Sequence, residues 1–206
     1  MAGVRSSKTV NGTTYNYTTL SGLVVRQTWD GKSIDFIYDD ANQPYLMRYK
    51  SSANATPVTY YFILNVQGDV MGLMDSDAAI VAQYEYDPWG KVLETNITVS
   101  ESDTNYALYE AVAEANPLRY RGYYYDTESG FYYLQTRYYD PTIGRFLNAD
   151  TFATTDINSI LSTNMFSYCE NNPVNRSDPS GEMFGELIGG ALLGGVINVA
   201  ATCFIA

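Results

Sequence analysis

The chain has 206 residues, which is enough for one or two domains with a sizeable core. Its formal net charge is −11 and its 12 lysines and arginines are scattered singly, so we expect no nucleic-acid partner. The absence of histidine and the presence of only 2 cysteines exclude histidine-dependent nucleophiles, most zinc sites and a disulfide framework. Any catalysis would therefore use carboxylates, and we expect neither a cofactor nor a metal.

Residues 1–93 are typical of a run of β-hairpins. After a polar start at residues 1–20, apolar and polar residues alternate with a period of two between regularly spaced turn residues. Asp30 and Gly31 separate two such runs, which is a strong hairpin signal. The predicted strands are residues 23–29, 34–38, 45–49, 59–64, 70–74 and 80–86.

Residues 94–116 break this alternation. Residues 107–115 have a helix-forming composition, and Glu101, Asp103 and Asn105 are candidate caps before them. We therefore predict an insertion or linker that contains one short helix. Residues 156–166 are a second candidate for a short helix.

Tyrosines are packed into short runs in the next segment, residues 117–181. Each of two runs is followed by an aspartate, Asp126 or Asp140, and each turn ends on a glycine four residues later. Tyrosine favours strands, while aspartate and glycine favour turns. The pattern predicts three consecutive antiparallel strands at residues 119–125, 131–139 and 145–148.

The tail, residues 182–206, ends in an apolar stretch. Residues 187–206 carry no charge, and their length is at the lower end for a membrane span. Glycines recur at the four-residue spacing at which membrane helices pack closely. Two interpretations stay open: a helix packed inside its own protein, and a helix in contact with a membrane.

Three segments resemble the Rhs and YD-repeat family. Residues 60–93 end in YEYDPWG and look like the last full repeat, and residues 118–150 are similar to the Rhs-associated core signature. Residues 171–181, NNPVNRSDPSG, resemble the terminal motif of the family. The resemblance implies an all-β fold: antiparallel hairpins in a curved or spiral sheet, a plug-like C-terminal segment and one or two short helices.

The resemblance also implies a structural function. In this family the repeats form a hollow shell, the core closes it, and a variable C-terminal region, usually a toxin, is held inside. The 25 residues after Gly181 are too few for a toxin domain. We therefore expect the closing segment of such a shell or a truncated remnant of one, non-catalytic, with residues 182–206 as the start of the variable region. Its partners would be the rest of the shell and an encapsulated toxin.

The resemblance indicates a secreted or cell-surface protein. Residues 1–17 lack the apolar segment of a secretory signal. A cytosolic protein, export by another route, and a piece of a larger protein are all compatible with this start.

A second function is suggested by the aspartates near the terminal motif, because many family members cut themselves there. Asp150 and Asp178 are the candidate dyad, since two carboxylates that share a proton can hydrolyse a peptide bond. Arg145 could orient one of them, and Asp140 could support the site. Glu182 stands where the family usually has leucine, which argues against cleavage.

Two further interpretations compete with a protease. The sequence Asp178-Pro179-Ser180-Gly181 has the preferred composition of a type I turn, so Asp178 could simply open a turn. A surface adhesin or carbohydrate-binding module is the third function class, because exposed tyrosine rings stack well on sugars. That function would require rings arrayed on an open face.

Overall fold

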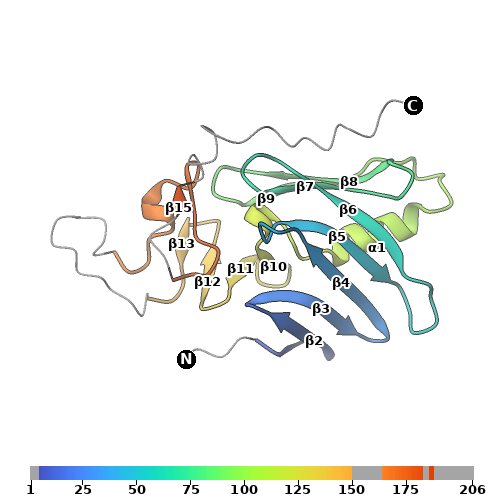
Figure 1. Cartoon of the computed structure of the whole chain (residues 1–206), viewed down its shortest axis with the longest axis horizontal. Coiled ribbons are helices and arrows are strands. Elements are labelled where there is room, and N and C mark those ends of the chain that lie inside the picture. The colour runs from blue at the N-terminus through green and yellow to red at the C-terminus, as the bar shows by residue number, and fades with distance from the viewer. Residues whose placement is uncertain (1–4, 150–163, 183–185, 188–206) are drawn as a thin grey trace.

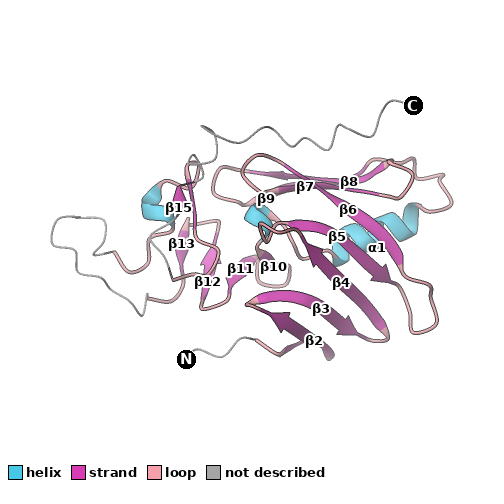
Figure 2. Cartoon of the chain, viewed as in Figure 1, coloured by secondary structure: helices cyan, strands magenta, loops and turns pink. Residues whose placement is uncertain are grey.

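A computed structural model of the chain describes residues 5–149, 164–182 and 186–187. Its strands form a nine-stranded sheet, a four-stranded sheet and a two-stranded sheet. Figure 1 shows that the nine-stranded sheet curves around an α-helix, with the smaller sheets beside it. Figure 2 shows far more strand than helix among the described residues, so the predicted all-β class is confirmed.

The nine strands of the large sheet are hydrogen-bonded in sequence order, each antiparallel to the next. They are β1 (Ser7–Val10), β2 (Thr13–Leu20), β3 (Leu23–Trp29), β4 (Lys32–Tyr38), β5 (Pro44–Lys50), β6 (Val58–Leu64), β7 (Val70–Met74), β8 (Ile80–Tyr86) and β9 (Val92–Ile97). The six predicted strands are all present, within one or two residues of β3 to β8. The sequence analysis missed β1 and β2, which lie in the polar start of the chain, and β9, which overlaps the segment predicted as an insertion.

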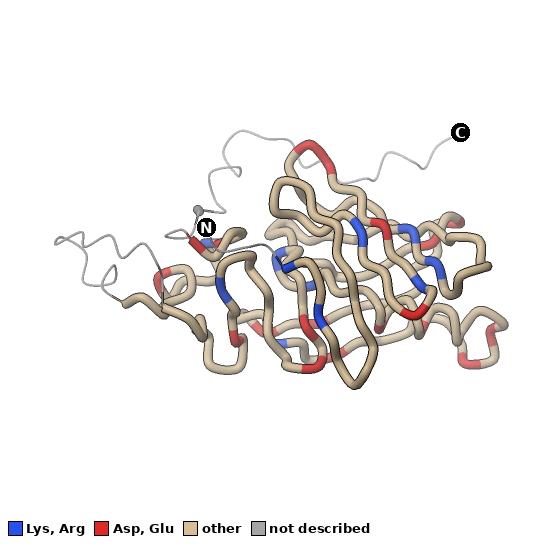
Figure 3. Tube along the Cα trace, turned by 90° about the horizontal axis from the view of Figure 1, so that it is seen from below, with Lys and Arg blue, Asp and Glu red and all other residues tan. Residues whose placement is uncertain are grey.

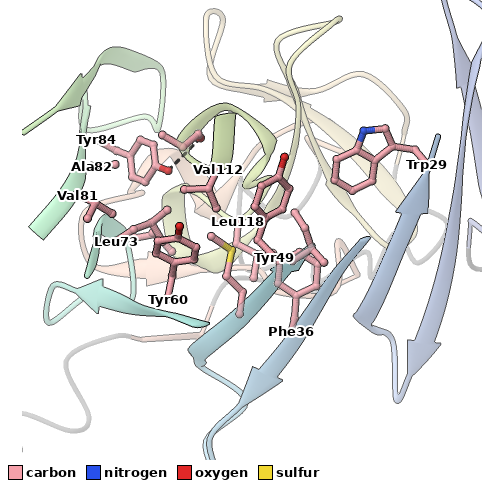
Figure 4. Packing of buried hydrophobic residues seen from close by; sticks show 14 residues of the cluster. Trp29, Phe36, Tyr49, Tyr60, Leu73, Val81, Ala82, Tyr84, Val112 and Leu118 are labelled. Atoms are coloured by element: carbon pink, nitrogen blue, oxygen red, sulfur yellow. Dashed lines mark hydrogen bonds between the residues drawn. The ribbon is translucent and has the colours of Figure 1, made fainter. Parts of the chain in front are cut away.

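The core lies on the inner face of this sheet, which we define as the face that packs against the α-helix. Cross-strand neighbours such as Met47 and Tyr60 are fully buried there. Because side chains alternate between the faces of a strand, the period of two in the sequence delivers every second residue to this core. Figure 4 shows rings and aliphatic chains from β3 to β8 converging on Val112 and Leu118.

The helix α1 (Tyr106–Ala115) confirms the predicted short helix. Its buried face carries Val112 and Ala113, and the Tyr84 hydroxyl donates to the Ala113 carbonyl at 3.0 Å. The helix thus belongs to the main hydrophobic core. The boundaries proposed for an insertion at residues 94–116 remain a prediction.

The tyrosine segment forms an antiparallel meander, but with four strands where three were predicted. They are β10 (Tyr124–Asp126), β11 (Phe131–Leu134), β12 (Arg137–Asp140) and β13 (Arg145–Phe146). The predicted turns at residues 126–130 and 140–144 are present. The prediction of one strand over residues 131–139 was wrong, because Leu134 pairs with Arg137 across a tight turn in which Gln135 has φ of 54°.

The start of the first predicted tyrosine strand was also wrong. Residues 120–122 form the 3-10 helix η1 (Tyr120–Gly122), in which Arg121 has φ of 56°. The backbone N–H of Arg121 donates to the buried carboxylate of Asp69 at 2.9 Å. This tertiary contact holds a conformation that the local composition does not predict.

The C-terminal part contains the 3-10 helix η2 (Cys169–Asn171) and a two-stranded sheet of β14 (Arg176–Ser177) and β15 (Glu186–Leu187). Leu187 is therefore in a strand, not at the start of a helix as predicted. Residues 188–206 of the predicted apolar helix, and residues 156–163 of the second candidate helix, lie outside the described residues. Within the described residues, no helix is long and apolar enough to cross a membrane.

Candidate functional site

Buried tyrosines build the part of the molecule that precedes the terminal motif. Their rings pack in edge-to-face, tilted and stacked contacts, the closest being Tyr139 on Tyr168 with 4.1 Å between ring centroids. Such aromatic contacts contribute about 0.5–1.5 kcal/mol each beyond area burial. We call this set the tyrosine cluster: Tyr120, Tyr123, Tyr132, Tyr139, Phe146 and Tyr168.

The tyrosine cluster is hydrogen-bonded to the turn at residues 87–90. The hydroxyls of Tyr139 and Tyr132 donate to the carbonyls of Trp89 and Gly90, each at 2.7 Å, and that of Tyr120 donates to the Pro88 carbonyl at 3.0 Å. The turn is closed by Gly90, where a Cβ atom would lie 2.5 Å from the Tyr120 ring. The four-stranded sheet thus packs against the turn at residues 87–90.

Burial keeps these phenols neutral. It raises the pKa of Tyr120 to about 12 and raises the pKa values of Tyr123, Tyr132 and Tyr168 well above the ordinary value of 10.0. Removal of the ring from water disfavours the phenolate. The hydroxyls therefore act as hydrogen-bond donors and acceptors, and none is suited to act as a base near neutral pH.

The terminal motif is held against this cluster through Asp178, whose side chain is fully buried. One carboxylate oxygen, Oδ1, accepts the backbone N–H of Gly181 at 2.9 Å, and Oδ2 accepts from Nη2 of Arg137 at 3.1 Å. The backbone N–H of Asp178 donates to the Tyr123 hydroxyl at 2.8 Å. Asp178 thus opens a turn, as one interpretation predicted, and also forms a buried ion pair.

The carbonyl of Gly181 is bound by two side chains from the β11–β12 turn and the start of β12. It accepts hydrogen bonds from Nε of Arg137 at 2.5 Å and from the Thr136 hydroxyl at 2.9 Å, and the same hydroxyl contacts the Ser180 carbonyl. Gly181 has φ of 70°, and a Cβ atom there would lie 2.6 Å from the Leu134 carbonyl oxygen. Only glycine fits this approach to the β11–β12 turn. We call this group of contacts the junction clasp: Thr136, Arg137, Asp178 and Gly181.

Arg137 is the central residue of the junction clasp, and the sequence analysis missed it. Its guanidinium lies 3.6 Å from the centroid of the Phe146 ring, and its Nη1 donates to the Met165 carbonyl at 3.3 Å. A signal was present, because strand alternation puts Arg137 on the same face as Tyr139 two residues later. A charged side chain on that apolar face requires a partner.

The other predicted site residues lie elsewhere or are not described. Asp140 and Arg145 are register partners at the start of the β12–β13 turn, where Asp140 Oδ1 accepts the Thr142 N–H at 2.8 Å. Asp140 thus stabilises the start of a turn. Arg145 is exposed. Asp150 lies outside the described residues. The structure therefore leaves the pairing of Asp150 with Asp178 as a prediction.

The N-terminal hairpin also contacts the tyrosine meander. Both Arg5 and Lys8 bond the buried carboxylate of Asp126 at 2.6 Å. The Arg5 guanidinium lies over the rings of Tyr17, Tyr124 and Tyr133, at 4.4–4.9 Å from their centroids. Asp126, predicted only as a turn opener, thus ties the start of the large sheet to the four-stranded sheet.

Charges elsewhere are dispersed. Figure 3 shows the lysines and arginines spread along the large sheet and not gathered into one stripe. Among the described residues, no group of three or more histidine, cysteine, aspartate or glutamate side chains could hold a metal ion.

Comparison with known proteins identifies relatives that match most of this chain. The family model for the Teneurin YD-shell matches residues 26–174. The tRNA nuclease WapA of Bacillus subtilis (strain 168) is 35% identical over 187 residues, and the match covers 87% of this chain. The tRNA3(Ser)-specific nuclease WapA of Bacillus spizizenii is 34% identical over 187 residues, with the same 87% of this chain covered. The chain spans 7% of the length of these curated relatives.

The fold is also found in solved structures. The crystal structure of TcdB2-TccC3-Cdc42 superposes with a TM-score of 0.64 at 22% sequence identity, over 85% of this chain and 8% of that chain. At this identity the similarity concerns the fold alone. It agrees with the curved antiparallel sheet described above.

Proposed function

Because this chain belongs to the Teneurin YD-shell family, we propose that it is the closing segment of an Rhs and YD-repeat shell that encapsulates a C-terminal toxin. Its partners would be the rest of that shell and the toxin, and the assembled protein would be secreted or on the cell surface. Contact of residues 187–206 with a membrane remains part of this proposal. In this role the chain is structural and non-catalytic.

The junction clasp is the observation that carries the proposal. It fixes the backbone at Gly181, at the end of the terminal motif. The tyrosine cluster connects this clasp rigidly to the last repeat turn, through hydroxyl bonds to residues 88–90. A segment that closes a shell needs such a fixed exit, because the region that follows must be held at a defined place.

Self-cleavage by an aspartyl protease is the second candidate function. One observation favours it: two donors, Nε of Arg137 and the Thr136 hydroxyl, point at the Gly181 carbonyl next to the Asp178 carboxylate. Donors placed on a carbonyl oxygen stabilise the charge that develops there during hydrolysis. The dyad would be Asp150 and Asp178, with Arg145 and Asp140 as supporting residues.

Two features favour the structural role over cleavage. Both carboxylate oxygens of Asp178 are already occupied, by Gly181 and Arg137. Glu182 adds a negative charge where the family usually has leucine, and that charge opposes activation of water between carboxylates. The adhesin alternative has less support, since the rings of the tyrosine cluster are buried against one another.

A domain exchange tests the proposal. The segment of Bacillus subtilis WapA that aligns with this chain is replaced by the chain itself, and the C-terminal region of the product is digested with a non-specific protease beside the unmodified protein. If the chain closes a shell, that region resists digestion equally in both proteins. Rapid digestion in the chimera alone would contradict the closing role.

A further inference from the structure

The strand β9 is an open edge of the large sheet. Within the described residues it pairs only with β8, and the sheet order ends there. Thr98 donates its N–H to the Val81 carbonyl at 3.3 Å, so residues 98, 96 and 94 direct their backbone groups toward β8. By alternation, the N–H and C=O groups of Thr95 and Ile97 point away from the sheet, within the regular part of the β8–β9 ladder. Such a row of unpaired groups is a template for another strand.

A groove lies between this edge and the helix α1. Its volume is about 620 Å³, and its walls include Thr95 and Ile97 from β9 and Tyr106, Glu110 and Glu114 from α1. Thr95 pairs with the buried Tyr84, so the side chains of Thr95 and Ile97 lie on the inner face, toward α1. A strand added beside β9 would therefore direct every second side chain into the groove.

The α1 wall of the groove carries negative charge that the helix does not compensate. Glu110 and Glu114 are exposed and four residues apart, a spacing at which like charges destabilise a helix. Glu114 is in the last turn, near the negative end of the helix dipole, and that turn contains no basic residue. Neither glutamate forms an ion pair with any described residue.

The one cation on the groove wall is already engaged. Arg119 is buried, and its guanidinium donates to the carbonyls of Ala113 and Leu118. It also stacks over the Tyr84 ring at 3.9 Å from the centroid. The groove therefore offers carboxylates at its rim and an unpaired backbone edge along its side.

We propose that β9 is a docking edge for an extended peptide segment that adds as a strand and carries lysine or arginine at the alternate positions facing α1. Charge complementarity with Glu110 and Glu114 selects a basic occupant. A second copy of this chain fits poorly, since pairing two β9 edges would bring two such acidic helices together. The proposal goes beyond the closing function and depends only on the described edge and helix.

Binding of a short synthetic peptide of alternating threonine and lysine to the full chain tests this inference by isothermal titration calorimetry. We expect saturable binding with one peptide per chain, and a loss of affinity of about tenfold or more in Glu110→Gln/Glu114→Gln. The matched control is Glu85→Gln/Glu94→Gln, which removes the same charge from the outer face of β8 and β9. The control should bind nearly as tightly as the unmodified chain.

A second peptide separates strand addition from simple charge attraction. Methylation of alternate backbone nitrogens keeps every lysine but removes the N–H groups that would pair with β9. We expect this peptide to bind about tenfold more weakly or worse. Equal binding of the methylated peptide, equal effects of the two double variants, or no binding to the unmodified chain would each overturn the proposal.

Discussion

Arg137 and Asp178 are 41 residues apart in the chain, yet they form a buried ion pair of 3.1 Å that joins the β11–β12 turn to the terminal motif. Both side chains are nearly inaccessible to water. The same arginine holds the Gly181 carbonyl, so one residue fixes both ends of the terminal turn.

Breaking the Arg137–Asp178 pair should destabilise the protein strongly. Arg137→Gln leaves the Asp178 carboxylate buried without its cation, which costs about 3–5 kcal/mol in comparable pairs. The free energy of unfolding from urea titration checks this value. The control is Arg26→Gln, because the Arg26–Asp35 pair is solvent-exposed and contributes about 0–1 kcal/mol. Similar losses of unfolding free energy in the two variants would show that the buried pair contributes no more to stability than an exposed pair.

Alanine at Gly181 should be more harmful than alanine at Gly130, although both glycines have positive φ. At Gly130 the added Cβ meets only the Tyr125 hydroxyl at 3.8 Å, so Gly130→Ala costs about 1–3 kcal/mol for the backbone alone. At Gly181 the Cβ would lie 2.6 Å from the Leu134 carbonyl oxygen, and the turn must move. Thermal unfolding of both variants gives the comparison, and equal losses would contradict the close approach.

Two buried tyrosines should respond in opposite directions to loss of the hydroxyl. The Tyr60 hydroxyl is buried and has no hydrogen-bond partner among the described residues, so Tyr60→Phe should raise the free energy of unfolding by about 1 kcal/mol. The Tyr84 hydroxyl donates to the Ala113 carbonyl at 3.0 Å, so Tyr84→Phe should lower it by about 1 kcal/mol. Urea titrations of the two variants decide the matter. A loss in Tyr60→Phe would indicate an unrecognised partner.

The protein should lose stability in alkali. Burial raises the pKa values of Tyr60 and Tyr120 to about 12, whereas the ordinary value is 10.0. The unfolded chain therefore releases these protons at lower pH than the folded chain, and the stabilisation present below pH 10 is lost as pH rises through 12. Tyrosinate absorbance followed against pH should show these phenols ionising together with unfolding. Their gradual ionisation in the folded protein near pH 10 would contradict the burial.

The sequence predicted the fold where local chemistry decides it. Alternation and turn residues located β3 to β8, and the tyrosine runs located the meander. The split between β11 and β12 was missed because Gln135 carries no turn signal of its own; the pairing of Leu134 with Arg137 imposes it. The 3-10 turn at Arg121 depends on Asp69, which is far away in sequence.

The candidate site was predicted only in part, for the same reason. Asp178 was identified from its motif, but a turn motif does not reveal which distant side chain pairs with it. Arg137 lies 41 residues away, and only the folded meander brings it to the terminal motif. Asp140 and Arg145 were predicted as supporting residues of the Asp150–Asp178 dyad, and their register pairing fits a turn.

Intact-mass spectrometry of the freshly purified chain tests most directly whether its role is structural and non-catalytic, because it shows whether the chain cuts itself. The junction clasp, the occupied carboxylate of Asp178 and the charge of Glu182 predict that the mass of the uncut chain dominates at neutral pH. A dominant product that ends at Gly181 or Glu182, and that disappears in both Asp178→Asn and Asp150→Asn, would contradict the structural role and establish an aspartyl protease.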